Sequence, residues 1–306
     1  MEKPVIEVII PTYRPDSQVI ELVRRLKKQT VPPDRIHMID TRSGSFPEEL
    51  EADPGIKLTR IEPEHFDHGG TRAMGADASS AEILIFMTQD AMPANPNLIE
   101  NLVKALRQEK VGAAYARQLP AKDCRVIERY TRSFNYPKES FVKSWDDLPK
   151  MGIKTYFCSN VCAAYRKDIY DSLGGFEERT IFNEDMILAA KIIQSGYRVA
   201  YAADAEVIHS HNYSVRQQFH RNFDLAVSQA EHPEIFEGIR SEDEGIKLVK
   251  KTAKHLLDIR KPWLIVTLVM QSAGKYLGYR LGKRYQKLPG WMIRKCTMSP
   301  LYWESD

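Results

Sequence analysis

Runs of apolar residues alternate with helix-like patterns along the first half of the chain. Residues 5–11 and 83–87 are apolar runs with the length typical of buried strands, and weaker strand patterns cover residues 35–40 and 56–61. In the intervals, apolar residues recur every three or four positions, as on one face of a helix. Strands that alternate with helices indicate a largely parallel sheet with helices on both faces, so we predict an α/β fold.

The pattern changes in the second half of the chain. Residues 118–155 lose the regular spacing and are rich in charged and aromatic residues, so we expect an irregular insertion there. Strand and helix patterns resume from residue 158, with two short strands at 199–201 and 205–209. From residue 246 onward only helical spacing remains, which predicts a helical C-terminal extension.

Charge is distributed unevenly along the 306 residues. The net charge is only +3, yet residues 246–306 hold 13 Lys and Arg against 3 Asp and Glu. Basic helices with interspersed aromatic residues are typical of segments that contact an anionic membrane surface, which we expect as a partner. Alternatively, the apolar residues of this extension pack on the rest of the chain or on a second subunit. An acidic body without a recognition motif makes nucleic acid a poorer fit.

Several classes of protein are excluded by composition. The four cysteines form no Cys-x-x-Cys pair and are too few for a disulfide framework, so we expect a reducing compartment. Residues 1–4 lead directly into a strand pattern, so we expect no signal peptide. The longest apolar run, residues 263–270, is far shorter than the roughly 20 residues of a membrane-spanning helix.

Polar residues follow the predicted strands. Thr12 and Tyr13 follow the first strand, Asp40 ends the second, and Asp90 follows the apolar run 83–87. In parallel sheets, ligands bind at the carboxyl ends of the strands, so one pocket could collect these side chains. The Asp90 carboxylate suits a divalent cation on a diphosphate. It could equally cap the following helix.

Two further acids and two histidines could carry chemistry. Glu184 and Asp185 open a predicted helix, where the helix dipole stabilises acids, but one of them could be a general base. Adjacent helical residues point about 100° apart, so at most one faces a given site. His209 and His211 are two residues apart at a strand end, which is the spacing of metal or phosphate ligands and also of incidental surface histidines. Arg221 suits a diphosphate or a solvated helix face.

The order of these motifs resembles that of family 2 glycosyltransferases of the GT-A fold, over about residues 4–225. The resemblance implies a Rossmann-like, mostly parallel central sheet flanked by helices. The motifs are Ile-Pro-Thr-Tyr at 10–13, Asp40, Gly70 to Gly75, Thr-Gln-Asp at 88–90, Gly-Gly-Phe at 174–176, Glu184-Asp185 with Leu188, Gly196-Tyr197 and Val-Ile-His at 207–209.

Within this family the chain resembles bacterial rhamnosyltransferases that use dTDP-L-rhamnose. The resemblance lies in residues 66–72, 87–91 and 209–214, together with Phe219, Arg221 and Phe223-Asp224. Such enzymes build O-antigen, capsule or cell-wall polysaccharide, often on an acceptor linked to polyprenyl diphosphate. The resemblance therefore implies inverting transfer of L-rhamnose by a cytoplasmic enzyme that is peripheral at the inner face of the cell membrane.

The resemblance also implies roles for individual residues. Asp185 matches the catalytic base, and Asp90 with His209 would bind the divalent metal, Mg²⁺ or Mn²⁺. Thr88 replaces the first acid of the family's Asp-x-Asp motif, so Arg72 or Arg221 could share the diphosphate charge. The implied nucleotide-binding residues are Pro11, Thr12, Tyr13, Arg14, Asp40, Arg72 and Gln89, and those near the acceptor or diphosphate are Asn160, Glu184, His211 and Arg221.

We predict a catalytic domain over residues 1–230, with a nucleotide part to about residue 117 and an acceptor part after it, and a basic extension over residues 231–306. Three alternatives stay open. The donor could be a UDP-hexose. The chain could be a sugar nucleotidyltransferase, although its Gly-Gly-Thr-Arg segment at 69–72 follows the third strand instead of the first. It could also be an inactive membrane-docking homologue. A homodimer is a further expectation.

Overall fold

The computed structural model describes residues 3–44, 46–238 and 242–304. The chain forms two compact units that alternate along the sequence. The first unit contains Met1–Leu119, Tyr136–Arg179 and Glu184–His209, and the second contains Pro120–Asn135, Thr180–Asn183 and Ser210–Asp306.

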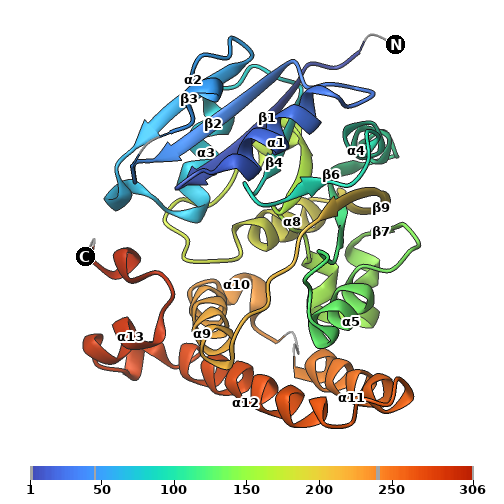
Figure 1. Cartoon of the computed structure of the whole chain (residues 1–306), viewed down its shortest axis with the longest axis vertical. Coiled ribbons are helices and arrows are strands. Elements are labelled where there is room, and N and C mark those ends of the chain that lie inside the picture. Colours follow the sequence, from blue (N-terminus) through green and yellow to red (C-terminus); the bar gives the residue numbers. More distant parts are fainter. Residues whose placement is uncertain (1–2, 45, 239–241, 305–306) are drawn as a thin grey trace. The chain divides into compact units, whose positions relative to one another are not determined.

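A mixed β-sheet forms the centre of the first unit, with strand order β3-β2-β1-β4-β8-β6-β9-β5 and β7 beside β9 (Figure 1). Strands β3, β2, β1 and β4 are parallel, as predicted, whereas β8 runs antiparallel between β4 and β6. The strands are β1 (Ile6–Tyr13), β2 (Arg35–Thr41), β3 (Ile56–Ile61), β4 (Ile83–Met87), β5 (Met92–Pro93), β6 (Val111–Leu119), β7 (Phe141–Lys143), β8 (Cys162–Arg166) and β9 (Arg198–Ile208).

Strand β9 is continuous where the sequence pattern predicted two short strands. Its pairing with β6 is interrupted between Ala116 and Arg117, which pair with Ala202 and Glu206 respectively. The strand therefore bulges at the point where the apolar pattern breaks, because the residues between these pairs have no partner in β6.

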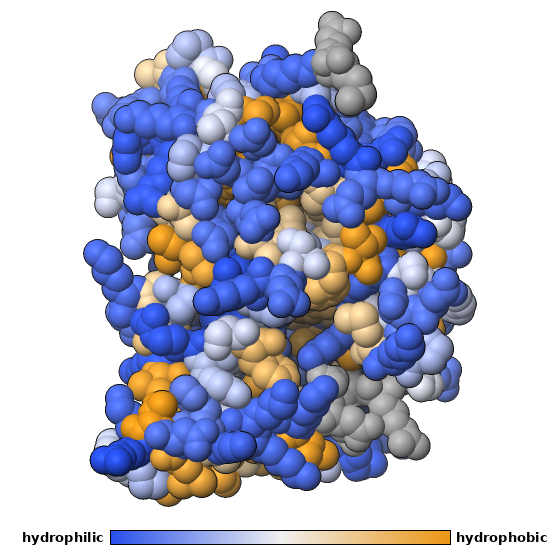
Figure 2. Space-filling model, turned by 90° about the vertical axis from the view of Figure 1, so that its right-hand side faces the viewer, coloured by the Kyte–Doolittle hydropathy of each residue, from blue (hydrophilic) through white to orange (hydrophobic). Residues whose placement is uncertain are grey.

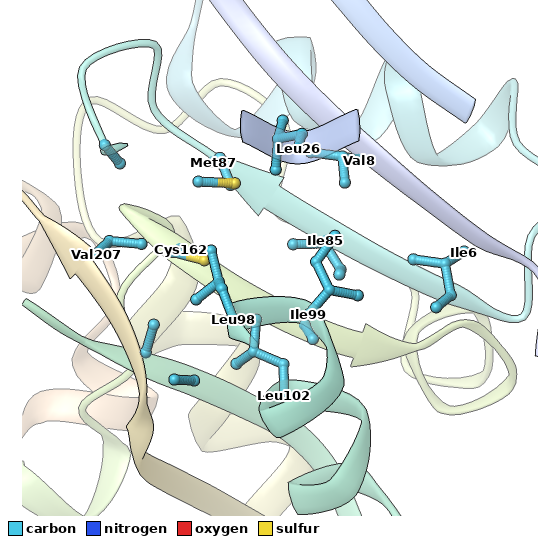
Figure 3. Close-up of a cluster of buried hydrophobic side chains, with 14 of the residues drawn as sticks. Ile6, Val8, Leu26, Ile85, Met87, Leu98, Ile99, Leu102, Cys162 and Val207 are labelled. Atoms are coloured by element: carbon cyan, nitrogen blue, oxygen red, sulfur yellow. The ribbon is translucent and has the colours of Figure 1, made fainter. Parts of the chain in front are cut away.

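Helices cover both faces of the sheet, which agrees with the predicted α/β architecture. One face packs on α1 and α4 through a cluster that includes Val8, Leu26, Ile85 and Leu102 (Figure 3). The opposite face carries Ile9, which contacts Gly75 of α3. The helices of this unit are α1 (Ser17–Lys27), α2 (Glu48–Glu51), α3 (His68–Asp77), α4 (Leu98–Leu106), α6 (Leu148–Met151), α7 (Lys167–Ser172) and α8 (Glu184–Gln194).

The second unit is helical, as predicted for the C-terminal extension, and it also includes α5 and α9. The expectation of an irregular insertion at 118–155 is wrong in part, because α5 is a regular helix with an ion pair between Glu128 and Arg132. The helices are α5 (Val126–Asn135), α9 (Val215–Glu231), α10 (Pro233–Phe236), α11 (Glu242–Asp258), α12 (Leu264–Gly282) and α13 (Gly290–Cys296).

Helices α9 and α12 pack closely side by side (Figure 1). Gly274, Gly278 and Gly282 of α12 face backbone carbonyls of α9, and a Cβ atom at Gly278 would lie 2.1 Å from the Phe219 oxygen. Only glycine permits this approach, since any side chain would push the helices apart. The glycine spacing therefore fixes which face of α12 is turned toward α9.

The motif residue Asp224 has a structural role in this unit. Its buried carboxylate accepts hydrogen bonds from the Thr297 hydroxyl at 2.6 Å and the Met298 amide at 2.8 Å. Burial raises the pKa of Asp224 to about 6, although both hydrogen bonds oppose this shift. The carboxylate thereby ties the segment after α13 to α9.

Among the residues that the structure describes, no helix combines the length and apolar character needed to cross a membrane.

Candidate active site

One edge of the sheet in the first unit gathers the polar residues that follow the strands. Because β1, β2, β4, β6 and β9 run in the same direction, their carboxyl ends meet at this edge, together with the start of the antiparallel strand β8. Thr88 at the end of β4 donates its amide to the Val161 carbonyl at 3.2 Å. The segments around Asp90 and Asn160 are therefore neighbours, although they are 70 residues apart.

Thr12 and Asp40 meet at the ends of β1 and β2. The Thr12 hydroxyl donates to the Asp40 carboxylate at 3.0 Å, and both side chains are buried. Burial raises the pKa of Asp40, while the bond from Thr12 opposes that shift. Pro11 precedes them in β1 and pairs with Ile39 of β2. These residues form the part of the predicted nucleotide site that lies on the paired ends of β1 and β2.

The main chain of Tyr13, the last residue of β1, is held by Gln89. The Gln89 side chain accepts a hydrogen bond from the Tyr13 amide and donates one to the Tyr13 carbonyl, each at 2.9 Å. The Tyr13 side chain is nevertheless 49% exposed, with the Arg14 guanidinium 5.1 Å from its ring centre. A fixed main chain with an exposed ring suits stacking on a planar base.

Asp90 and His209 form the candidate metal site. The Asp90 carboxylate lies 3.4 Å from Nε2 of His209, and Nδ1 of His209 lies 3.1 Å from the side-chain oxygen of Gln118. The Gln118 side-chain nitrogen donates to the Ser159 hydroxyl at 3.0 Å, so the Gln118 side-chain oxygen faces His209 and can accept a proton from Nδ1. In that tautomer Nε2 would present a lone pair on the side of Asp90, as in histidines that bind metals.

The donor set fits a divalent ion. Adjacent ligands of an octahedral ion lie about 3 Å apart when each is about 2.1 Å from the metal, which is close to the separation of Asp90 and His209. The Thr88 hydroxyl, at the position of the missing acid, is buried without a hydrogen-bond partner among the described residues. A neutral hydroxyl does not replace the charge of a carboxylate ligand.

The prediction that His209 and His211 share the face of a strand is wrong. Strand β9 ends at Ile208, so both histidines lie after it, and His211 belongs to the second unit. There its ring lies 4.9 Å from that of Tyr213. The two-residue spacing thus carries no strand geometry, and a ligand role for His211 stays a prediction.

Asp185 lies at the first turn of α8, where Asn160 contacts it. The main-chain amide of Asn160 donates to the Asp185 carboxylate at 3.0 Å, and the side-chain nitrogen of Asn160 donates to Glu184 at 3.1 Å. Both acids therefore reach the same residue through different atoms, which spacing on a helix did not predict. The Tyr165 hydroxyl donates to the Asn160 side-chain oxygen at 2.9 Å and fixes its orientation.

Charges around this pair separate the two pKa values. Burial and the neighbouring Glu184 carboxylate raise the pKa of Asp185 to about 7. Burial would also raise the pKa of Glu184, but Arg72 and His68 lower it overall. The Arg72 guanidinium lies 3.2 Å from Glu184 and donates to the His68 carbonyl at 2.8 Å. Glu184 is thus the permanent anion, and Asp185 is poised to accept a proton near neutral pH.

Arg221 belongs to the second unit. Its guanidinium lies 4.6 Å from the ring centre of Phe182 and 5.8 Å from that of Tyr213. These contacts orient the guanidinium through cation–π interaction, and its predicted role at a diphosphate stays a prediction.

Gln118, Ser159 and Tyr165 were not predicted, although they position the predicted residues. Gln118 is a polar residue near the end of β6, and that strand shares the edge with β4. Polar residues at strand ends would have identified it once the sheet order was known. Tyr165 gave no signal, because its hydroxyl is buried within an apolar strand and its partner lies before β8.

The chain belongs to the family described as glycosyl transferase family 2, whose pattern matches residues 7–174. It is therefore a glycosyltransferase, and the sequence-based assignment to this family is confirmed. Two proteins named O-antigen chain rhamnosyltransferase are similar to it. RfbN of Salmonella typhimurium is 41% identical, covering 98% of this chain and 96% of its own, and WbaN of Salmonella anatum is 38% identical, covering 99% and 96%.

Solved structures confirm the GT-A-like fold. The mannosyltransferase PcManGT from Pyrobaculum calidifontis, solved with GDP-Man and Mn²⁺, has a TM-score of 0.59 at 19% identity and covers 99% of this chain and 86% of its own. S. aureus TarS 1-349 with UDP-GlcNAc has a TM-score of 0.53 at 15% identity and covers 92% and 91%.

Proposed function

We propose that this chain transfers L-rhamnose from dTDP-L-rhamnose, with inversion, to a saccharide acceptor in the synthesis of bacterial O-antigen. The observation that carries the proposal is the identity of 41% and 38% to two O-antigen rhamnosyltransferases over nearly the whole of each chain. The acceptor we expect is linked to polyprenyl diphosphate, which would place the enzyme at the inner face of the cell membrane.

The site geometry supports a single displacement. The acceptor oxygen attacks the anomeric carbon, the bond from that carbon to the diphosphate breaks, and Asp185 accepts the proton of the acceptor hydroxyl. Asp90 and His209 would hold Mg²⁺ or Mn²⁺, and a metal bound there would neutralise charge on the diphosphate. Arg72 is buried and paired with Glu184, so its charge mainly balances that acid, and its role at the diphosphate stays a prediction. Because a single displacement inverts configuration, a β-linked donor gives an α-linked product.

The base and ribose of the nucleotide would lie on Tyr13 and the Thr12–Asp40 pair, with Arg14 and Gln89 beside them. Asn160 and Glu184, next to the proposed catalytic base, would contact the acceptor or diphosphate. The same role for His211 and Arg221, which belong to the second unit, stays a prediction. A UDP-hexose donor is the second candidate, because the structures with GDP-Man and UDP-GlcNAc indicate that this fold serves several nucleotides. Retention of the Asp90–His209 pair and of Asp185 argues against an inactive homologue.

Thermal-shift measurements test the donor and the metal. A ligand that binds only the folded protein raises its melting temperature, and at about 100 times its Kd it adds about 2.7 kcal/mol of stability. We therefore expect dTDP, the nucleotide of the proposed donor, to raise the melting temperature more than UDP or GDP at the same concentration. Mn²⁺ should increase the dTDP shift. Asp90→Asn should remove the Mn²⁺-dependent part alone. Asp204→Asn, which alters an exposed acid of β9, is the matched control. A larger shift with UDP than with dTDP would favour the UDP-hexose donor.

The rate of transfer should depend on pH through Asp185. A base must be deprotonated to act, so we expect kcat/KM to fall as the pH drops through about 7. Glu184→Gln should move this acidic limb to lower pH, because the neutral side chain no longer raises the pKa of Asp185. Glu109→Gln, at an exposed position, should leave the limb in place. An unmoved limb in Glu184→Gln would contradict the pairing of the two acids.

A further inference from the structure

One face of α12 is both apolar and exposed. The side chains of Val266, Val269, Met270, Tyr276 and Leu277 are between 54% and 69% exposed. With Ala273 and Arg280 they recur every three or four residues, so they form one continuous stripe along the helix, called here the α12 stripe. In Figure 2, apolar side chains reach the surface along the lower edge, at the level of α12 in Figure 1.

The α12 stripe cannot turn inward. Gly274, Gly278 and Gly282 are in close contact with α9, and rotation of α12 would place side chains against the α9 backbone. The Tyr279 hydroxyl also bonds Gln229 of α9 at 3.0 Å. A helix that is apolar on its packed side and again on its solvent side is typical of helices with a partner on each side.

The segment that contains the α12 stripe carries charge of a single sign along the sequence. Residues 259–303 contain nine Lys and Arg and no Asp or Glu. Two exposed tryptophans lie in the same segment. Trp263 before α12 is 65% exposed, and Trp291 in α13 is 63% exposed, with the Lys295 ammonium 5.2 Å from its ring centre. The nine basic residues are Arg260, Lys261, Lys275, Arg280, Lys283, Arg284, Lys287, Arg294 and Lys295.

We infer that the α12 stripe lies in the surface of an anionic lipid bilayer, with α12 parallel to the membrane plane and Trp263 and Trp291 at the headgroups. An exposed apolar stripe, interfacial tryptophans and uniformly positive flanks are the features of helices that bind in this way. A second copy of the chain is a poorer partner, since two such positive faces would repel each other. Through this surface the proposed enzyme would reach its lipid-linked acceptor. This purpose rests on the proposed function, whereas membrane binding itself does not depend on it.

Vesicle flotation of the full chain tests this inference. We expect binding to vesicles of phosphatidylcholine with phosphatidylglycerol, weaker binding to phosphatidylcholine alone, and loss of the difference at high salt. The double variant Trp263→Gln with Val266→Ser should lower the partition coefficient about tenfold or more, because it removes apolar surface from the interface. The variant Val5→Ser with Trp145→Gln makes the same two changes at exposed positions of the first unit and should bind normally.

A charge variant separates the contribution of apolar burial from that of attraction to anionic lipid. Arg284→Glu with Lys287→Glu, both at exposed positions after α12, should remove the preference for phosphatidylglycerol while leaving the α12 stripe in place. All variants should keep the thermal shift with dTDP, so failure to bind vesicles and failure to bind the nucleotide are separate results. Equal flotation of the stripe variant and its control would overturn the inference. So would a dimer, measured by sedimentation, that the stripe variant dissociates, because the α12 stripe would then be a subunit interface.

Discussion

Replacing Asp185 by Asn should reduce rhamnosyl transfer by a factor of about 10² to 10⁴, the range that a general base contributes. The side-chain amide oxygen introduced by this substitution can still accept the hydrogen bond that the Asn160 amide donates to Asp185. It cannot take the proton of the acceptor hydroxyl. We therefore expect the loss in kcat, measured with dTDP-L-rhamnose and a lipid-linked acceptor, while the thermal shift with dTDP stays close to that of the unmodified enzyme.

Asp146→Asn is the matched control for this prediction. Asp146 is an exposed acid of the first unit, and the same chemical change there should leave the rate unaltered. If Asp185→Asn kept more than about a tenth of the activity, the base would have to be another residue. The effect of Glu184 on the pKa of Asp185 would then have no role in catalysis.

Replacing Gly278 by Ala should destabilise the second unit by about 3 kcal/mol, at the upper end of the usual cost of overpacking. The new methyl group would lie 2.1 Å from the Phe219 carbonyl oxygen, so α9 and α12 would have to separate. Three of the four tryptophans, Trp263, Trp291 and Trp303, lie in this unit. Urea unfolding followed by tryptophan fluorescence therefore reports the change.

Gly245→Ala gives the opposite sign and serves as the control. Gly245 lies in α11, and among the described residues no atom outside its own helix backbone and chain neighbours lies within 4 Å of the position that a Cβ atom would take there. Alanine at this position should therefore stabilise the helix by about 0.5–1 kcal/mol. Equal stability changes at both positions would mean that the α9–α12 contact is looser than the glycine spacing indicates.

Local patterns in the sequence were sufficient for the parallel half of the sheet. The apolar runs of β1 and β4 and the polar residues after them depend on neighbours along the chain, and they placed Thr12, Asp40 and Asp90 at one edge correctly. Helical spacing likewise predicted the C-terminal region. Helix α5 was missed although Ile127, Tyr130 and Phe134 recur at helical spacing, because it has only ten residues and lies within a stretch that was interpreted as irregular as a whole.

The sequence by itself determined the family, the fold class and the identities of the proposed reacting groups, because each depends on short motifs and their order. Only the tertiary structure decided how those groups are held. The antiparallel insertion of β8 brings Asn160 to Asp185 and Glu184, and the end of β6 brings Gln118 to His209. These contacts join residues 24 to 91 positions apart, and no local periodicity encodes such pairings. The exposed face of α12 was likewise decided by the glycines that fix the opposite face on α9, a choice that the apolar pattern of the helix left open.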